Sequence, residues 1–253
     1  MEIAKVTFAG PLSPADRELC RRFGIDEATD AVAARAWQLC RRDGELILAG
    51  PAAAGRMVID TNPGAGEFGR RLQTARRTDP LPRAVGLHRR LPSVVDATAG
   101  LGRDALVLAR LGCAVVAIER VAALALLLAD SVARMPPPWR VVVHHDEAAR
   151  FLAALAIDAR PDVVYLDPMF QAPGKAQVRK ATQALRLLCG PPGNVEQLFA
   201  AAVAVARDRV VVKRHRDDPP IAGEPDFAVR GSSVRFDVYL SSRRTPSRGS
   251  RRP

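Results

Sequence analysis

The sequence predicts an α/β fold, in which a mostly parallel sheet with helices on both faces is joined to a small N-terminal α+β unit. From Val94 onward, short valine-rich runs alternate with segments of helical periodicity, as in βαβ units. The first run ends in a glycine-rich turn, and later runs end in acidic residues. Residues 1–85 instead hold short elements broken by glycine and proline, which is typical of a separate unit.

The elements expected in residues 1–85 are short. Residues 2–8 read as a strand, and residues 13–23 as a helix with Ser13 as N-cap and Pro14 at the first helical position. A second helix or mixed segment is expected over 31–41. Residues 45–49 and 56–60 read as paired strands, since glycines divide them.

Residues 86–242 are expected to form the main domain. Buried strands are predicted at 94–96, 113–118, 140–144, 161–166 and 209–214. Helices are predicted over 105–109, from about 122 to 135, from about 147 to 155, over 174–188 and from about 195 to 206. Residues 227–230 and 233–239 read as a terminal hairpin. The arginine-rich tail, 243–253, is expected to be disordered.

The glycine-rich turn follows Asp96 and contains Gly100 and Gly102. Two glycines this close let the backbone approach a ligand, and the next helix points its N–H groups at it. The following strand ends in Glu119, at the spacing expected for a carboxylate that accepts from ribose hydroxyls. The turn therefore predicts a nucleotide-type cofactor site, although an ordinary βα turn or a dinucleotide loop has the same pattern.

Acidic residues also follow the third and fourth strands of this domain. Asp146 falls at the carboxyl end of its strand, where open α/β sheets bind ligands, and can accept from an adenine amino group. Asp167 and Pro168 place a carboxylate beside a proline carbonyl, and Phe170 can stack on a planar base. The chemistry is therefore expected at this edge, although an isolated motif of this kind is also an ordinary turn.

Composition restricts the class of protein. The 253 residues carry 38 Lys and Arg against 27 Asp and Glu, a formal net charge of +11, which favours a polyanionic partner such as nucleic acid. The four cysteines are far apart and indicate neither a zinc site nor a disulfide framework, and adjacent His144 and His145 have no third ligand nearby. We expect no metal, no membrane span and no signal peptide, and hence a cytoplasmic protein.

Two groups of basic residues are the candidate contacts to phosphates. One is the cluster at 70–77 in the N-terminal unit, and the other lies around the expected pocket. A solvated helix face is the alternative interpretation for the first group. The candidate RNA-binding residues are Arg70, Arg71, Arg76, Arg77, Lys175, Lys180, Lys213 and Arg214.

Several motifs together resemble the bacterial ribosomal small subunit methyltransferase J family. They are 96–104 (DATAGLGRD), Glu119-Arg120, 164–170 (VYLDPMF), 211–214 (VVKR) and 235–239 (RFDVY). The resemblance covers roughly residues 85–240 and implies a Rossmann-like class I methyltransferase sheet with S-adenosylmethionine as cofactor. It further implies methylation of the exocyclic N2 of a guanine in 16S ribosomal RNA, as naked RNA or within the small ribosomal subunit.

The resemblance also implies site residues. Arg103, Asp104, Glu119, Arg120, Asp146, Glu147 and Asp167 fall where the family binds its cofactor, beside Asp96, Gly100 and Gly102 of the glycine-rich turn. The chain departs from the family at Asp146-Glu147, where small hydroxyl residues are expected, and at 70–77, where a glycine-rich basic loop is expected. Two alternatives stay open: a silent RNA-binding or ribosome-assembly protein on the same fold, and an NAD-dependent oxidoreductase.

Overall fold

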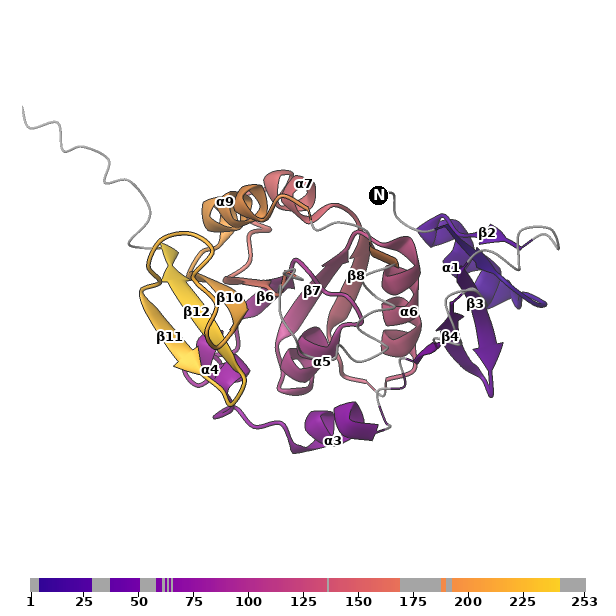
Figure 1. The fold of residues 1–253 in the computed structure, drawn as a ribbon, viewed down its shortest axis with the longest axis horizontal. Helices are drawn as coiled ribbons and strands as arrows, with labels where there is room; N and C mark the ends of the chain where they lie inside the picture. Colours follow the sequence, from indigo (N-terminus) through magenta and orange to yellow (C-terminus); the bar gives the residue numbers. More distant parts are fainter. Residues whose placement is uncertain are drawn as a thin grey trace, which may run out of the picture.

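The computed structural model describes residues 5–28, 37–50, 58–60, 62, 64, 66–135, 137–168, 188–189 and 193–241. These residues form a seven-stranded sheet and a five-stranded sheet. In Figure 1 the small indigo sheet lies to one side of the large one, with α6 (Ala122–Ala133) between them. The four cysteines are free.

The large sheet confirms the predicted α/β architecture. Its order is β11-β12-β10-β9-β6-β7-β8. The five strands from β10 to β8 pair in parallel. Strand β12 pairs antiparallel with β11, as the predicted hairpin, and also with β10. Their bounds are β6 (Ser93–Asp96), β7 (Ala114–Glu119), β8 (Val141–His145), β9 (Val163–Leu166), β10 (Arg209–His215), β11 (Phe227–Arg230) and β12 (Val234–Leu240).

Helices cover both faces of this sheet because its central strands are apolar on both sides. Val94 and Tyr165 point to one face, where they join the core formed with α6 and α5 (Arg103–Arg110). Val95 and Val164, their neighbours in sequence, point to the other face, covered by α7 (Ala148–Ala153) and α9 (Val195–Val205). The alternation decides which face each side chain points to, while the parallel pairing brings the carboxyl ends of the strands to the same edge of the sheet.

The small sheet has the order β2-β1-β3-β4-β5. Its strands are β1 (Val6–Phe8), β2 (Asp26–Glu27), β3 (Trp37–Arg42), β4 (Glu45–Ala49) and β5 (Val58–Asp60), and β4 pairs antiparallel with β5 as predicted. Helix α1 (Pro14–Phe23) begins at the predicted N-cap, where the Ser13 hydroxyl accepts from the Asp16 backbone N–H at 3.1 Å.

Two expected elements differ from the structure. The helix or mixed segment expected over 31–41 was wrong for its last residues: Trp37 and Leu39 alternate with less buried positions in β3, which pairs with β1 and β4. The strand at 140–144 was expected to be buried, but β8 is an edge strand and Val142 is 52% exposed. Most of the helix predicted at 174–188 and the tail at 243–253 lie outside the described residues.

The small sheet packs directly onto the large domain. One continuous apolar core includes Phe8 and Leu46 of the small sheet and Leu124 of α6. Arg22 of α1 donates to the Val143 carbonyl of β8 at 2.8 Å. Helix α3 (Gly66–Thr74) lies against α5, and α4 (Pro80–Ala84) lies against β11 and β12. The segment at 66–84 is therefore attached to the large sheet.

Candidate active site

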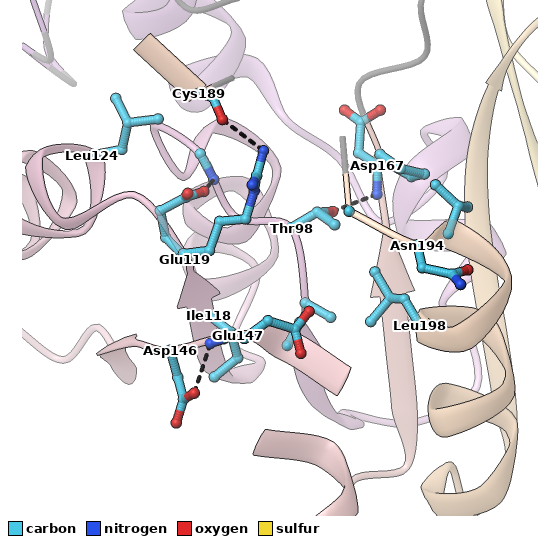
Figure 2. Close-up of a pocket in the computed structure, with 17 residues that line it drawn as sticks. Thr98, Ile118, Glu119, Leu124, Asp146, Glu147, Asp167, Cys189, Asn194 and Leu198 are labelled. Carbon is cyan, nitrogen blue, oxygen red and sulfur yellow. Dashed lines mark hydrogen bonds between the residues drawn. The ribbon is translucent and has the colours of Figure 1, made fainter. Parts of the chain in front are cut away.

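A pocket of about 820 Å³, its open mouth included, lies at the carboxyl ends of the parallel strands. Figure 2 shows its lining side chains, which come from the end of β7, from α6, from the turns after β6, β7, β8 and β9, from Cys189 and from the start of α9. The lining includes seven of the residues expected at the site: Gly100, Glu119, Arg120, Asp146, Glu147, Asp167 and Pro168.

The glycine-rich turn is shaped by two positive φ angles. Gly102 is the N-cap of α5 with φ +72°, and a Cβ there would collide with the Leu128 side chain of α6. Gly100 has φ +54°, with open space within 4 Å of where its Cβ would lie. Gly102 therefore serves the packing of the turn on α6, whereas Gly100 gives a ligand access to the backbone.

Glu119 ends β7 and holds the turn in place. Its carboxylate accepts from the Gly100 backbone N–H at 2.8 Å and from the Val121 backbone N–H at 2.8 Å. Burial raises the pKa of Glu119 above its ordinary value, although these backbone N–H groups oppose the shift. Glu119 thus combines two roles, as a wall of the pocket and as the support of its glycine backbone.

Asp146 and Glu147 line the opposite side of the pocket and point in different directions (Figure 2). Asp146 accepts from Arg150 Nε at 2.8 Å and from the Glu147 backbone N–H at 2.6 Å. Glu147 is the N-cap of α7 and accepts from the Arg150 backbone N–H at 3.0 Å. Both carboxylates therefore already help to begin α7.

Asp167 follows β9 at the pocket, beside Pro168. Its backbone N–H donates to Thr98 Oγ1 at 2.6 Å, which ties the end of β9 to the turn after β6. Its Oδ2 accepts from Lys213 Nζ at 2.8 Å, and its side chain is 39% exposed. Partial burial raises the pKa of Asp167, and Lys213 opposes this shift.

Asp104 belongs to a charge cluster behind the pocket wall. It is 7% exposed and accepts from Lys213 Nζ at 2.9 Å and from the Tyr165 hydroxyl at 2.6 Å, while Arg71 of α3 pairs with its other oxygen. Burial raises its pKa, but Lys213 and Arg71 outweigh burial and hold it at about 2. Asp104 is therefore ionised, and it is absent from the residues that line the pocket in the described part of the chain.

The remaining predicted cofactor residues lie around the pocket without lining it. Asp96 is 2% exposed and accepts from the Thr98 backbone N–H at 3.2 Å, and burial raises its pKa well above the ordinary value. Arg103 is exposed at the start of α5, with its guanidinium 5.8 Å from the centre of the Phe68 ring. Phe170, Lys175 and Lys180 lie outside the described residues.

The predicted phosphate contacts fall into two groups. Arg70, Arg76 and Arg77 are exposed on α3 and the segment after it. Arg71 and Lys213 instead pair with Asp104, and Arg214 is 6% exposed, with its Nε donating to the Pro219 carbonyl at 3.0 Å. Among the described residues, the first group is exposed and makes no ion pair with a carboxylate, so it is the group open to a polyanion.

Sequence reasoning missed the contact between Lys213 and Asp167, although the strands contain a signal for it. In the parallel pair β9 and β10, Val212 lies opposite Leu166, so the next residues, Lys213 and Asp167, lie side by side. It also missed the pocket wall formed by Cys189, Asn194 and Leu198, because apolar and amide side chains on a helix carry no comparable pattern.

Comparisons with known proteins agree with this geometry. The family model described as "Putative SAM-dependent methyltransferase" matches residues 18–241. A ribosomal RNA small subunit methyltransferase J from Chromobacterium violaceum is 40% identical over 88% of this chain and 91% of its own length. The chain belongs to the ribosomal RNA small subunit methyltransferase J family. Another member, from Chromohalobacter salexigens, is 39% identical over 95% of this chain and 97% of its own length.

A solved structure supports the same assignment for the fold. The crystal structure of a SAM-dependent methyltransferase from Neisseria gonorrhoeae has 31% sequence identity and a TM-score of 0.71, and the match covers 93% of this chain and 95% of that one. As a methyltransferase J family member, the protein is an enzyme whose cofactor is S-adenosylmethionine. Family membership therefore decides against the NAD-dependent oxidoreductase.

Proposed function

We propose that the protein transfers a methyl group from S-adenosylmethionine to the exocyclic N2 of a guanine in 16S ribosomal RNA. The observation that carries the proposal is the Asp167 carboxylate at the pocket, beside Pro168 at the end of β9. Two adjacent acceptors suit an amino group with two hydrogens. The names of the family relatives and the net charge of +11 support an RNA substrate.

The chemistry of the pocket fits the cofactor. Glu119 offers carboxylate oxygens to the two ribose hydroxyls, and the open space at Gly100 admits a ligand against the backbone. Ile118 and Leu198 give apolar walls suited to an adenine ring. We assign Asp146, which also accepts from Arg150, to the adenine amino group. In this proposal Arg120 and Glu147 complete the cofactor contacts, while Asp96, Gly102, Arg103 and Asp104 support them from outside the pocket.

The reaction depends more on the orientation of the amino group than on a strong acid or base. The cofactor supplies a methyl group already activated on a sulfonium sulfur. A guanine amino group is a weak nucleophile because its lone pair is delocalised into the ring, so Asp167 and the Pro168 carbonyl accept its hydrogens and hold the nitrogen in line. The proton leaves after transfer, so Asp167 need not be a strong base. We assign Phe170, outside the described residues, to stacking on the extruded base.

The RNA is proposed to approach across α3 and the segment after it, where Arg70, Arg76 and Arg77 are exposed. Lys175 and Lys180, outside the described residues, are further candidates. The partner is then 16S ribosomal RNA or the small ribosomal subunit, in the cytoplasm. In the part of the chain that the structure describes, no helix is long and apolar enough to cross a membrane, and no group of residues could hold a metal ion.

The test is to map modified guanines in 16S ribosomal RNA from cells that lack the protein, with and without a plasmid copy. Wild-type protein should restore one N2-methylguanine, and Asp167→Asn should restore it poorly because the amide replaces one acceptor with a donor. An identical methylation map with and without the gene contradicts the proposal. Binding of S-adenosylmethionine together with such a map would show that the enzyme acts on another position or another RNA.

A further inference from the structure

The ammonium group of Lys213 lies between two carboxylates of different elements. Its Nζ donates to Asp167 Oδ2 at 2.8 Å and to Asp104 Oδ2 at 2.9 Å. We propose that Lys213 is a positioning residue, which fixes the orientation and charge of the Asp167 carboxylate for the incoming amino group. The inference rests on the proposed function in taking Asp167 as the acceptor of that group.

The position of Lys213 is itself fixed from behind. Asp104 of α5 accepts from the Tyr165 hydroxyl on the oxygen that also accepts from Lys213, and Arg71 of α3 pairs with its other oxygen. Tyr165 is fully buried and Asp104 is 7% exposed, so neither has freedom to move. The ammonium group is therefore held by an ionised, fully hydrogen-bonded anchor rather than by solvent.

The contact with Lys213 leaves one oxygen of the Asp167 carboxylate for the substrate. Lys213 occupies Oδ2, and among the described residues no hydrogen bond is made to Oδ1. The side chain of Asp167 is 39% exposed and lines the pocket, whereas that of Lys213 is 24% exposed and does not. Oδ1 can thus accept from an amino group while Oδ2 stays on Lys213, which fixes the plane of the carboxylate.

This arrangement reassigns Lys213 from the predicted phosphate contact. A lysine that binds phosphate presents its ammonium group to solvent, but here two carboxylates already accept from it. The neighbouring Arg71 is engaged with Asp104 in the same cluster. Both residues thus act behind the catalytic carboxylate, and the exposed Arg70, Arg76 and Arg77 are left as the phosphate contacts of this region.

The charged and titratable groups that face Asp167 come from five elements: Lys213 of β10, Asp104 of α5, Arg71 of α3, Asp96 of β6 and Tyr165 of β9. Lys213 favours the ionised form of Asp167 and Asp104 opposes it. Removing each charge should therefore move the protonation of Asp167 in opposite directions. A role confined to folding gives no such opposition, because both substitutions would simply loosen the cluster.

The experiment is the pH dependence of kcat for two variants with matched shapes. Lys213→Met should lower kcat at neutral pH at least about tenfold and move the acidic limb up by about one pH unit or more. Asp104→Asn should move that limb down instead, because the Lys213 ammonium group then interacts with the Asp167 carboxylate alone. Limbs that move in the same direction, or that stay in place, overturn the proposal.

Two further variants separate positioning from folding. Lys213→Arg keeps the charge and should retain the wild-type acidic limb, with the affinity for S-adenosylmethionine unchanged. Arg235→Met removes the cation of a comparable pair, with Asp237 of β12 at 2.8 Å, and should lower the melting temperature without moving the limb. If Lys213→Met does not fold, an acidic limb of Lys213→Arg that moves up by about one pH unit or more overturns the proposal.

A titration without substrate keeps this inference distinct from the proposed function. Carbon-13 labelling of aspartate carboxyl groups allows NMR to follow Asp167 directly, with Asp167→Asn used to assign its signal. The Asp167 signal should titrate at higher pH in Lys213→Met than in wild type, and at lower pH in Asp104→Asn. These shifts hold even if guanine proves to be the wrong substrate, whereas unchanged titration overturns the role of Lys213 alone.

Discussion

At the scale of single residues, the carboxylates of this site are set apart by what each one accepts. Glu119 accepts from two backbone N–H groups, Asp104 from three side chains, and Asp167 from one ammonium group. Carboxylate oxygens carry more lone pairs than these bonds use. Glu119 can therefore support the glycine-rich turn and still accept from ribose hydroxyls, and both roles depend on the same charge.

Glu119→Ala should weaken S-adenosylmethionine binding about 10- to 100-fold, since hydrogen bonds to a charged acceptor contribute about 1.5–3 kcal/mol. Titration calorimetry measures the effect. Glu119→Gln keeps one carbonyl acceptor and should fall between wild type and Glu119→Ala. A dissociation constant that is unchanged in Glu119→Ala, in protein that still melts cooperatively, would remove the ribose role.

The residues of the site were predictable to the extent that chain position determines them. Carboxylates that directly follow apolar strands meet at one edge of a parallel sheet, so Glu119, Asp146 and Asp167 could be placed together. Asp104 could not be excluded from the pocket, because only the packing of α5 sends its side chain toward Tyr165. Arg71 reaches Asp104 from another part of the chain, and no local pattern signals that contact.

At the scale of elements, the turn between β6 and α5 depends on Gly102 more than on Gly100. Gly102→Ala places a Cβ at φ +72° and against Leu128, which is fully buried in α6. The left-handed backbone costs about 1–2 kcal/mol, and overpacking adds about 1–3 kcal/mol. We therefore expect a melting temperature lower by several degrees and weaker cofactor binding, measured by calorimetry.

Gly24→Ala is the matched control for that prediction. Gly24 ends α1 with φ +67°, but open space surrounds the position of its Cβ. It should therefore show only the backbone cost and leave cofactor binding unchanged. Equal loss of stability in the two variants would show that contact with Leu128 contributes nothing.

Element types were predictable where the period of apolar residues was clear. The strands of the large sheet and α1 with its Ser13 cap follow directly from sequence. The segment around Trp37 did not, because its strand is stabilised by pairing with β1 and β4 rather than by its own propensity. The edge position of β8 likewise depends on sheet order, which no single segment encodes.

At the scale of the whole molecule, Arg41 joins the two sheets through buried carboxylates. It donates to Asp16 at 2.7 Å within the small unit and to Asp130 of α6 at 2.8 Å. Arg134 also donates to Asp130, at 3.0 Å. Removing Arg41 therefore leaves Asp130 with one arginine, but leaves Asp16 with Ser13 as its only side-chain donor among the described residues.

Arg41→Met should lower the free energy of unfolding at neutral pH by about 2–3 kcal/mol, less than for a fully buried pair because Arg41 is 31% exposed. Burial raises the pKa of Asp16, but Arg41 and Ser13 outweigh burial and hold that pKa below its ordinary value. A carboxylate whose pKa is lower in the folded than in the unfolded protein stabilises the fold at pH values above its unfolded pKa. This stabilisation is lost as the pH falls through its folded pKa. Denaturant titrations should show that the difference in free energy of unfolding between wild type and variant becomes smaller below about pH 4.

Arg134→Met is the control for this contact. It removes another arginine from Asp130 but leaves the bonds from Arg41 to Asp16 intact. Arg134→Met should lower the free energy of unfolding by less than Arg41→Met does. The difference in free energy of unfolding between Arg134→Met and wild type should also decrease less in acid. A gap for Arg41→Met that is the same at pH 7 and pH 3 would show that the pair with Asp16 does not stabilise the fold.

The division of the chain at residue 85 stays a prediction. Whether the N-terminal unit contacts RNA depends on the surface of the 66–84 segment. Arg76 and Arg77 are exposed there, and α3 and α4 on either side lie against the large domain. If the pair contacts phosphates, binding releases counterions, and each lost contact should flatten the log-log salt dependence of affinity by about 0.7–0.9. This outcome would make the segment part of the RNA-binding surface.

Arg76→Ala combined with Arg77→Ala should therefore flatten the salt slope for 16S ribosomal RNA while S-adenosylmethionine affinity stays intact. Arg17→Ala combined with Arg21→Ala also removes two positive charges, here from the exposed face of α1, and should leave the slope nearly unchanged. Deletion after Ser242 removes five arginines, Arg243, Arg244, Arg248, Arg251 and Arg252. A segment expected to be disordered loses conformational freedom when it binds, so this deletion should have little effect. If the tail deletion flattens the slope and the Arg76 and Arg77 variant does not, RNA docks through the tail instead.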